Sequence, residues 1–189
     1  MDSLRETESA NYVPASSRFF LVEEKSPDFS YDMFNNALSE GRPGFLISRD
    51  YPAELTKKYG LPDCKIIWLT HLVGENYLNP TSLGIIISII TKFLESCSKT
   101  TIMLDGIEYL ISQNNYERIL HFIHQLRDLV IIHDGMMIMP VDARVLDEKQ
   151  LALLERNLEV LVPPEKYGRR RFTFELEDGL LKVLKTTER

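Results

Sequence analysis

Short apolar segments alternate with segments of helical spacing along most of this chain, and this alternation constrains the fold more than any other feature of the sequence. The strand-like segments are 19–22, 44–48, 65–70, 101–105, 136–141 and 158–162. They are almost continuously apolar, and a strand without polar alternation is buried on both faces, as in a parallel sheet covered by helices. Because crossovers between parallel strands are right-handed, the sequence predicts a three-layer, doubly wound α/β domain with a mainly parallel sheet.

Apolar spacing and capping residues predict the helices between these strands. Tyr31, Phe34 and Leu38 lie at steps of three and four, which is typical of a helix that begins near Ser30. The further predicted helices are 50–60, 79–97, 107–111, 115–135 and 147–156. The polar stretch Gly74–Asn79 is predicted to be a loop that leads into the second of these helices.

Changes of pattern divide the chain into a leader (1–17), an α/β core domain (18–163) and a C-terminal appendage (164–189). The leader is rich in Ser, Glu and Asn and lacks an apolar period, so we expect it to be flexible. Residues 169–176 alternate in polarity, and Asp178 and Gly179 supply a turn before the chain returns, which predicts a β-hairpin. This hairpin is expected either to extend the sheet in an antiparallel direction or to mediate dimerisation.

Composition narrows the classes of partner. The net charge of −6 disfavours nucleic acid, because such binding depends on positive charge that releases counterions from phosphates. The longest apolar stretch, 83–94, is too short and too polar to span a bilayer, and the amino terminus has no signal-peptide core. The only two cysteines, Cys64 and Cys97, suit a reducing compartment. We therefore predict a cytoplasmic protein without a membrane partner.

Polar residues at the ends of the predicted strands are the candidates for a ligand site, because ligands of open parallel sheets bind outside the carboxyl ends of the strands. These candidate ligand-binding residues are Ser48, Arg49, Asp50, Asp105, Glu108 and Asp142. Asp105 has two interpretations. It resembles the second acidic motif of phosphate-loop nucleotide hydrolases, where an Asp at a strand end holds magnesium, or it caps the helix that begins near Ile107, which we favour.

Motifs that would accompany nucleotide or hydrolase chemistry are absent from the sequence. No G-x-x-x-x-G-K-[ST] phosphate cradle and no G-x-G-x-x-G dinucleotide fingerprint occurs. The turn Gly41–Gly44 precedes its strand, so it cannot place a helix amino terminus against phosphates. There is also no G-x-S-x-G nucleophile elbow. We therefore assign no catalytic residue and no cofactor.

Two clusters of charged residues are further candidates for a binding site. Glu117, His121, His124 and Asp128 form a stripe along the long helix, which is either a metal-ligand set or, as we favour, ordinary surface electrostatics. The basic run Arg169, Arg170 and Arg171 either contacts nucleic acid or an acidic partner, or protects a strand edge from aggregation, which we favour.

Three stretches together resemble the archaeal family called domain of unknown function 835. They are Gly41–Arg49 with Tyr51–Pro52, Ile67–Thr70 followed by Leu78–Pro80, and Leu104–Leu110 with Asn114. Val141–Asp142 and the run 147–155 fit the same pattern, so the resemblance covers residues 28–162.

This resemblance implies a signalling or regulatory role and a distant similarity to RecA-like ATPases that have lost the phosphate loop. In that comparison the strand that ends at Ser48–Arg49 stands where the loop would follow, and Asp105 stands where the magnesium Asp would be. The resemblance supplies no established activity and no ligand. Together with the missing cradle, it predicts a non-catalytic regulatory or scaffolding module that binds a protein partner or itself.

Two alternatives stay open. The first is a divergent nucleotide-binding or hydrolysing enzyme, in which Arg49 contacts phosphate and Asp105 holds a divalent ion. The second is a nucleic-acid-binding protein that uses Arg169–Arg171 and the hairpin.

Overall fold

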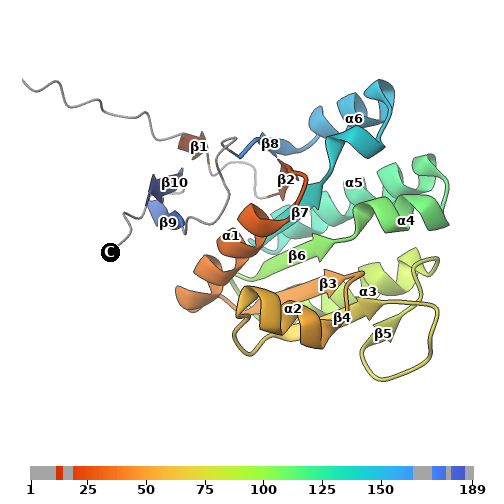
Figure 1. Ribbon diagram of the computed structural model, residues 1–189, viewed down its shortest axis with the longest axis horizontal. Coiled ribbons are helices and arrows are strands. Elements are labelled where there is room, and N and C mark those ends of the chain that lie inside the picture. The colour runs from red at the N-terminus through yellow and green to blue at the C-terminus, as the bar shows by residue number, and fades with distance from the viewer. Residues whose placement is uncertain (1–11, 15–18, 164–171, 178–179, 186–189) are drawn as a thin grey trace, which may run out of the picture.

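A parallel sheet of seven strands forms the centre of the molecule. The computed structural model describes residues 12–14, 19–163, 172–177 and 180–185, with side chains for 19–163 (Figure 1). The strands are β2 (Phe19–Glu23), β3 (Gly44–Ser48), β4 (Lys65–Leu69), β5 (Tyr77–Leu78), β6 (Thr101–Asp105), β7 (Met136–Val141) and β8 (Glu159–Leu161). Their order in the sheet is β5-β4-β3-β6-β7-β2-β8, and every neighbouring pair is parallel. The predicted α/β fold class is confirmed.

Six α-helices cover the two faces of this sheet (Figure 1). They are α1 (Asp28–Ser39), α2 (Pro52–Tyr59), α3 (Leu83–Ser96), α4 (Ile107–Gln113), α5 (Tyr116–Ile132) and α6 (Glu148–Glu155). The first two pack on one face, and the other four pack on the opposite face. The chain therefore winds first in one direction and then in the other, as a doubly wound sheet requires.

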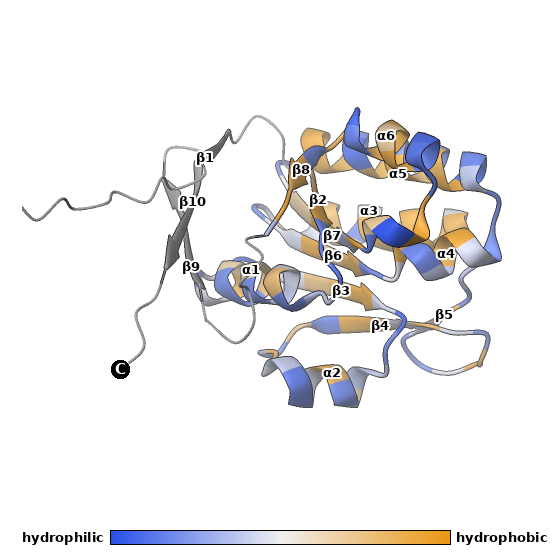
Figure 2. Cartoon of the chain, turned by 45° about the horizontal axis from the view of Figure 1, so that its top comes forward, coloured by the Kyte–Doolittle hydropathy of each residue, from blue (hydrophilic) through white to orange (hydrophobic). Residues whose placement is uncertain are grey.

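The two cores follow from the alternation of side chains along each strand. In β2, Phe20 and Val22 belong to the core beneath α1 and α2, whereas Phe19 and Leu21 belong to the core beneath α3 to α6. Because both faces are covered, all four side chains are buried, and each such burial contributes about 1.5–3 kcal/mol. Figure 2 shows the result as hydrophobic strands between helices whose outward sides are polar.

The stretch predicted to be a polar loop contains a strand. Tyr77 and Leu78 form β5, which adds to the sheet edge through the amide of Trp68, donating to the Asn76 carbonyl at 2.9 Å, and the amide of Thr70, donating to the Leu78 carbonyl at 2.9 Å. Such a short edge strand has no periodicity of its own and forms only because β4 offers it a partner. The prediction of a loop was wrong at these two residues.

The helix predicted to begin at Asn79–Pro80 starts three to four residues later. α3 begins at Leu83, because the Asn79 side chain instead closes a turn, accepting from the backbone amide of Thr81 at 2.9 Å and from its hydroxyl at 2.8 Å. Asn favours such local turns in competition with a helix. At α6, by contrast, Asp147 and Gln150 form a reciprocal capping box at the predicted start.

A small separate sheet is formed by the ends of the chain. β9 (Phe172–Glu177) and β10 (Leu180–Lys185) pair antiparallel, and β1 (Tyr12–Pro14) pairs antiparallel with β10. These strands do not extend the seven-stranded sheet, which was one of the two roles expected for the appendage. Residues 178–179 between β9 and β10 lie outside the described residues, as do Arg169, Arg170 and Arg171.

No helix in the described part of the chain is both long enough and apolar enough to cross a membrane. Cys64 and Cys97 are free and half-buried. Burial, followed by the charge of Asp63, raises the pKa of the Cys64 thiol to about 11, which disfavours the reactive thiolate.

Candidate functional site

The carboxyl ends of β3 and β6 bring the central candidate residues together. β3 leads into α2 on one face of the sheet, whereas β6 leads into α4 on the other, so the chain diverges between these neighbouring strands. The final residues of the two strands, Ser48 and Asp105, are direct partners in the sheet register. Such a switch point is where ligands bind in open α/β sheets.

Asp105 is held by two hydroxyl groups. The Tyr31 hydroxyl, from the first turn of α1, donates to Oδ2 of Asp105 at 2.7 Å, and the Ser48 hydroxyl donates to the same oxygen at 3.1 Å. The Ser48 oxygen in turn accepts from the backbone amide of Asp50 at 3.1 Å. The favoured interpretation of Asp105 as a helix cap was wrong, because α4 has Gly106 at its N-cap and no side-chain hydrogen bond there.

Burial raises the pKa of Asp105 to about 6. The hydrogen bonds from Tyr31 and Ser48 act in the opposite direction because they stabilise the carboxylate, while the nearby charges of Asp50 and Glu108 add to the increase. Asp105 is therefore a carboxyl group that titrates near neutrality and already has two hydroxyl donors. A ligand that used its Oδ2 atom would have to displace one of them.

Two tyrosines, Tyr31 from α1 and Tyr59 from α2, stack on each other beside Asp105. The rings of Tyr31 and Tyr59 lie parallel within 6°, with centroids 3.7 Å apart. Tyr31 is completely buried, and the Lys58 ammonium lies 4.5 Å from the centre of the Tyr59 ring. Burial, followed by the charge of Asp105, raises the pKa of the Tyr31 hydroxyl well above its ordinary value, so Tyr31 acts as a permanent donor. From the sequence, Tyr31 was predicted only as an apolar position of a helix.

Arg49 is exposed, and its side chain packs on α4. Its guanidinium lies 4.6 Å from the centre of the Tyr109 ring, in a cation–π arrangement, and its backbone carbonyl accepts from the indole of Trp68 at 2.8 Å. Gly106 permits this packing. It has a φ of +125°, and a Cβ atom there would lie 3.3 Å from the backbone nitrogen of Arg49.

Glu108 and Asp142 form a second group beside the first. Oε1 of Glu108 accepts from the backbone amide of Asp142 at 2.8 Å. The Asp142 carboxylate faces Arg144, whose Nε donates to Oδ1 at 2.8 Å, and this bond lowers the pKa of Asp142. The six candidates thus divide between two hydrogen-bonded clusters. One joins Ser48, Arg49, Asp50 and Asp105, with the Arg49 amide donating to the Asp105 carbonyl at 3.2 Å, and the other joins Glu108 and Asp142.

Glu24, which the sequence analysis did not single out, occupies the amino terminus of α1. Its Oε2 accepts from the Phe29 amide at 3.0 Å, and its Oε1 accepts from the Ser30 amide at 3.0 Å and from the Ser30 hydroxyl. Burial raises the pKa of Glu24 to about 7 even though these bonds favour the carboxylate. The signal for Glu24 was available, since it follows an apolar strand directly, but it has no motif of its own.

Replacing Glu24 with alanine is expected to lower the free energy of unfolding by about 1–2 kcal/mol, because the amides of Phe29 and Ser30 lose their acceptors. The measurement is the midpoint of urea unfolding at constant slope. Lys25→Ala, at the exposed neighbouring position, is the matched control and should unfold like the parent. Equal midpoints for the two variants would contradict a capping role for Glu24.

The stripe on α5 lies mostly in solvent. Glu117, His121 and Asp128 are exposed, and His124 is half-buried. In the described part of the chain, no group of three or more His, Cys, Asp or Glu side chains is arranged to hold a metal ion.

Comparison with known proteins first defines the class of fold. The chain is similar to the crystal structure of a KaiC-like protein from the hyperthermophilic archaeon Pyrococcus horikoshii OT3, with a TM-score of 0.56 and 13% identity, over 92% of this chain and 91% of that chain. At this identity the likeness shows the fold alone, which is that of RecA-like proteins.

The family follows from the sequence. The model of a family described as Protein of unknown function (DUF835) matches residues 23–158, and the chain belongs to this family. No curated protein matches the chain.

Proposed function

We propose that this protein is a non-catalytic regulatory or scaffolding module of archaeal signalling, which acts in the cytoplasm through protein–protein interaction. The observation that carries the proposal is the way in which the chain's own side chains occupy the positions that a nucleotide would need. Glu24 accepts from the amides of Phe29 and Ser30 at the start of α1, and the hydroxyls of Tyr31 and Ser48 both donate to Oδ2 of Asp105.

The start of α1 is the best candidate for a lost phosphate site. Tyr31 in its first turn contacts Asp105, so a phosphate at this helix end would lie near the carboxylate that could hold its magnesium ion. The loop from Glu24 to Pro27 then takes the place of the phosphate loop, rather than Ser48–Asp50 as the resemblance implied. It has four residues and no glycine, so its backbone cannot wrap around phosphates as a glycine-rich loop does.

Electrostatics supports the same conclusion. A phosphate at this helix end would meet the Glu24 carboxylate, with Asp28 next to it. Asp50, Asp105 and Glu108 add further negative charge at the neighbouring strand ends. No lysine stands in the Glu24–Pro27 loop except Lys25, which is exposed. Like charges at close range disfavour an anionic ligand.

A panel of nucleotides with magnesium, measured by thermal unfolding, tests the proposal. We expect no stabilisation by any nucleotide and no ATP hydrolysis, because a ligand raises stability only if it binds the native state. A nucleotide at a hundred times its Kd would add about 2.7 kcal/mol, which is readily seen as a higher Tm.

The alternative enzyme predicts the opposite result and has its own control. If magnesium with ATP stabilises the protein and Asp105→Asn abolishes the effect, the chain is a divergent nucleotide-binding protein and the proposal fails. Asp63→Asn, an exposed change of the same type, should leave the response unaltered in either case.

A further inference from the structure

Two apolar side chains project from the loop between β4 and β5. Leu72 is 63% exposed and Val73 is completely exposed, and Glu75 follows them on the same exposed turn. An isolated apolar residue on a surface needs no explanation, but two adjacent ones at the tip of a projecting loop are typical of an interaction site. We call Leu72 and Val73 the apolar knob.

The loop that carries the knob is held in place by its own hydrogen bonds. The Leu72 amide donates to the Thr70 hydroxyl at 3.2 Å, and the His71 ring lies 3.0 Å from the Gln113 side-chain oxygen. Gly74 packs against Tyr77 so closely that a Cβ atom would lie 2.6 Å from the ring. An ordered knob loses little conformational freedom when it binds, which favours association.

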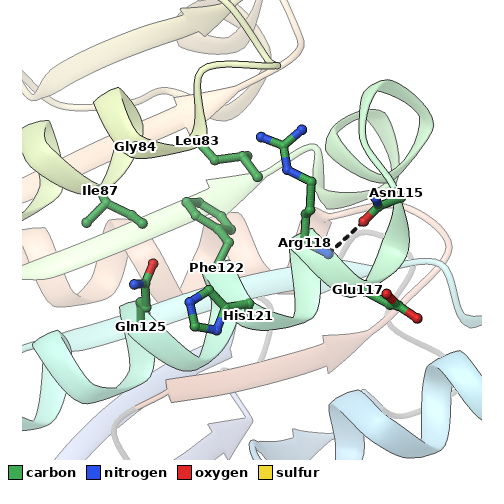
Figure 3. Close-up of a pocket in the computed structure, with 9 residues that line it drawn as sticks. All are labelled: Leu83, Gly84, Ile87, Asn115, Glu117, Arg118, His121, Phe122 and Gln125. Atoms are coloured by element: carbon green, nitrogen blue, oxygen red, sulfur yellow. Dashed lines mark hydrogen bonds between the residues drawn. The ribbon is translucent and has the colours of Figure 1, made fainter.

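A groove of about 430 Å³ lies between α3 and α5 (Figure 3). Leu83 and Ile87 from α3 and Phe122 from α5 provide its apolar lining. Gly84 leaves part of it open, because a Cβ atom at that position would have no neighbour within 4 Å. Polar side chains, among them Asn115, His121 and Gln125, complete the lining. The groove therefore combines an apolar floor with polar groups around it, as ligand and partner sites usually do.

Two charged residues of opposite sign, Glu117 and Arg118, line the groove, and the acidic Glu75 follows the knob. The Arg118 side chain stands at the rim and reaches toward α3, while Glu117 lies on the side away from Leu83 (Figure 3). Within the described residues, neither Arg118 nor Glu75 has an ion-pair partner, so each is available for a new one. An acidic residue two positions after the knob matches a basic residue at the edge of the groove.

We propose that the α3–α5 groove receives the apolar knob of a second copy of this chain, with Glu75 of one copy facing Arg118 of the other. This interface deepens the interaction role proposed above and rests on it. It specifies self-association through one knob and one groove per chain. Apolar anchors that fill a pocket, surrounded by complementary charges, are the usual centre of a specific interface.

The mass of the full chain in solution, measured by sedimentation over a range of concentrations, tests the interface. We expect species heavier than the monomer, and a dissociation constant at least roughly tenfold larger for Val73→Asp. Gly84→Gln, which places a side chain in the groove, should weaken association similarly without unfolding the protein, since a Cβ atom there has no neighbour within 4 Å and glutamine favours a helix more than glycine does. Ile132→Asp, at an apolar position that is 74% exposed at the far end of α5, is the matched control and should associate like the parent.

A charge exchange identifies the pairing. Glu75→Arg and Arg118→Glu should each weaken association, and the double variant should restore it, because the two charges then meet again in reversed order. A protein that stays monomeric at all concentrations, or an assembly indifferent to Val73→Asp and Gly84→Gln, would overturn the inference. That result would leave the non-catalytic proposal standing, since only a nucleotide response contradicts it.

Discussion

Replacing Tyr31 with alanine is expected to lower the free energy of unfolding by about 3–5 kcal/mol, which makes it one of the two largest effects that we predict. The ring is completely buried between the sheet and α2, and it stacks on Tyr59. Its removal leaves a cavity and deprives Asp105 of a hydroxyl donor at the same time. Urea unfolding at neutral pH measures the loss through the shift in midpoint.

Tyr31→Phe separates the hydroxyl from the ring. It keeps the packing but removes the 2.7 Å bond to Asp105, so we expect a smaller loss of about 1–3 kcal/mol, the cost of leaving a buried acceptor without this partner. Tyr51→Phe is the matched control, because Tyr51 is 48% exposed, and it should change stability little. If Tyr31→Phe were as stable as the parent, the hydrogen bond would contribute nothing and only packing would hold Tyr31 in place.

Asp105→Asn is expected to gain about 2–3 kcal/mol of stability relative to the parent as the pH rises from 4 to 7. The folded pKa of Asp105 is about 6 and its ordinary value is 3.8, so between these values the folded protein holds the proton more tightly than the unfolded chain. The stabilising effect of that proton is complete below pH 3.8 and is lost as the pH passes through 6. Asparagine does not titrate, so the variant escapes this loss of about 1.4 kcal/mol per pKa unit.

Urea unfolding of both proteins at pH 4, 5, 6 and 7 measures this difference. The relevant quantity is the parent-minus-variant free energy at each pH, because other carboxyl groups titrate equally in both proteins. Asp63→Asn, at an exposed position, reports the change that loss of any surface carboxylate produces. Parallel curves for the parent and Asp105→Asn would contradict the raised pKa and with it the account of Asp105 as a buried group held by Tyr31 and Ser48.

Much of the fold could be predicted because burial on both faces leaves a direct trace in the sequence. The strands Gly44–Ser48, Thr101–Asp105 and Met136–Val141 have the predicted bounds, since a run of apolar residues between turn signals has few other uses. The two residues of β5 could not be predicted in this way, because an edge strand of that length exists only through its neighbour.

The candidate site was predictable in location but not in its contacts. Placing Ser48 and Asp105 at strand ends needed only the parallel-sheet rule, and the structure makes them register partners. The sequence did not reveal whether Asp105 capped its own helix or bonded elsewhere, because both uses require the same residue at the same place. Arg49 was expected to converge with Asp105 at the strand ends, but its guanidinium packs on the Tyr109 ring.

By itself, the sequence determined that this chain forms a parallel α/β domain without a glycine-rich phosphate cradle, because periodicity and missing motifs are properties of neighbouring residues. Only the tertiary structure decided that Glu24 accepts from the first amides of α1 and that two hydroxyl groups already donate to Oδ2 of Asp105. Tyr31 reaches Asp105 across 74 positions of the chain, which no local pattern can report. Glu24 accepts from the amide of Phe29, five residues further along the chain, because the backbone turns between β2 and α1. That turn depends on the sheet, to which β2 belongs and on which α1 packs.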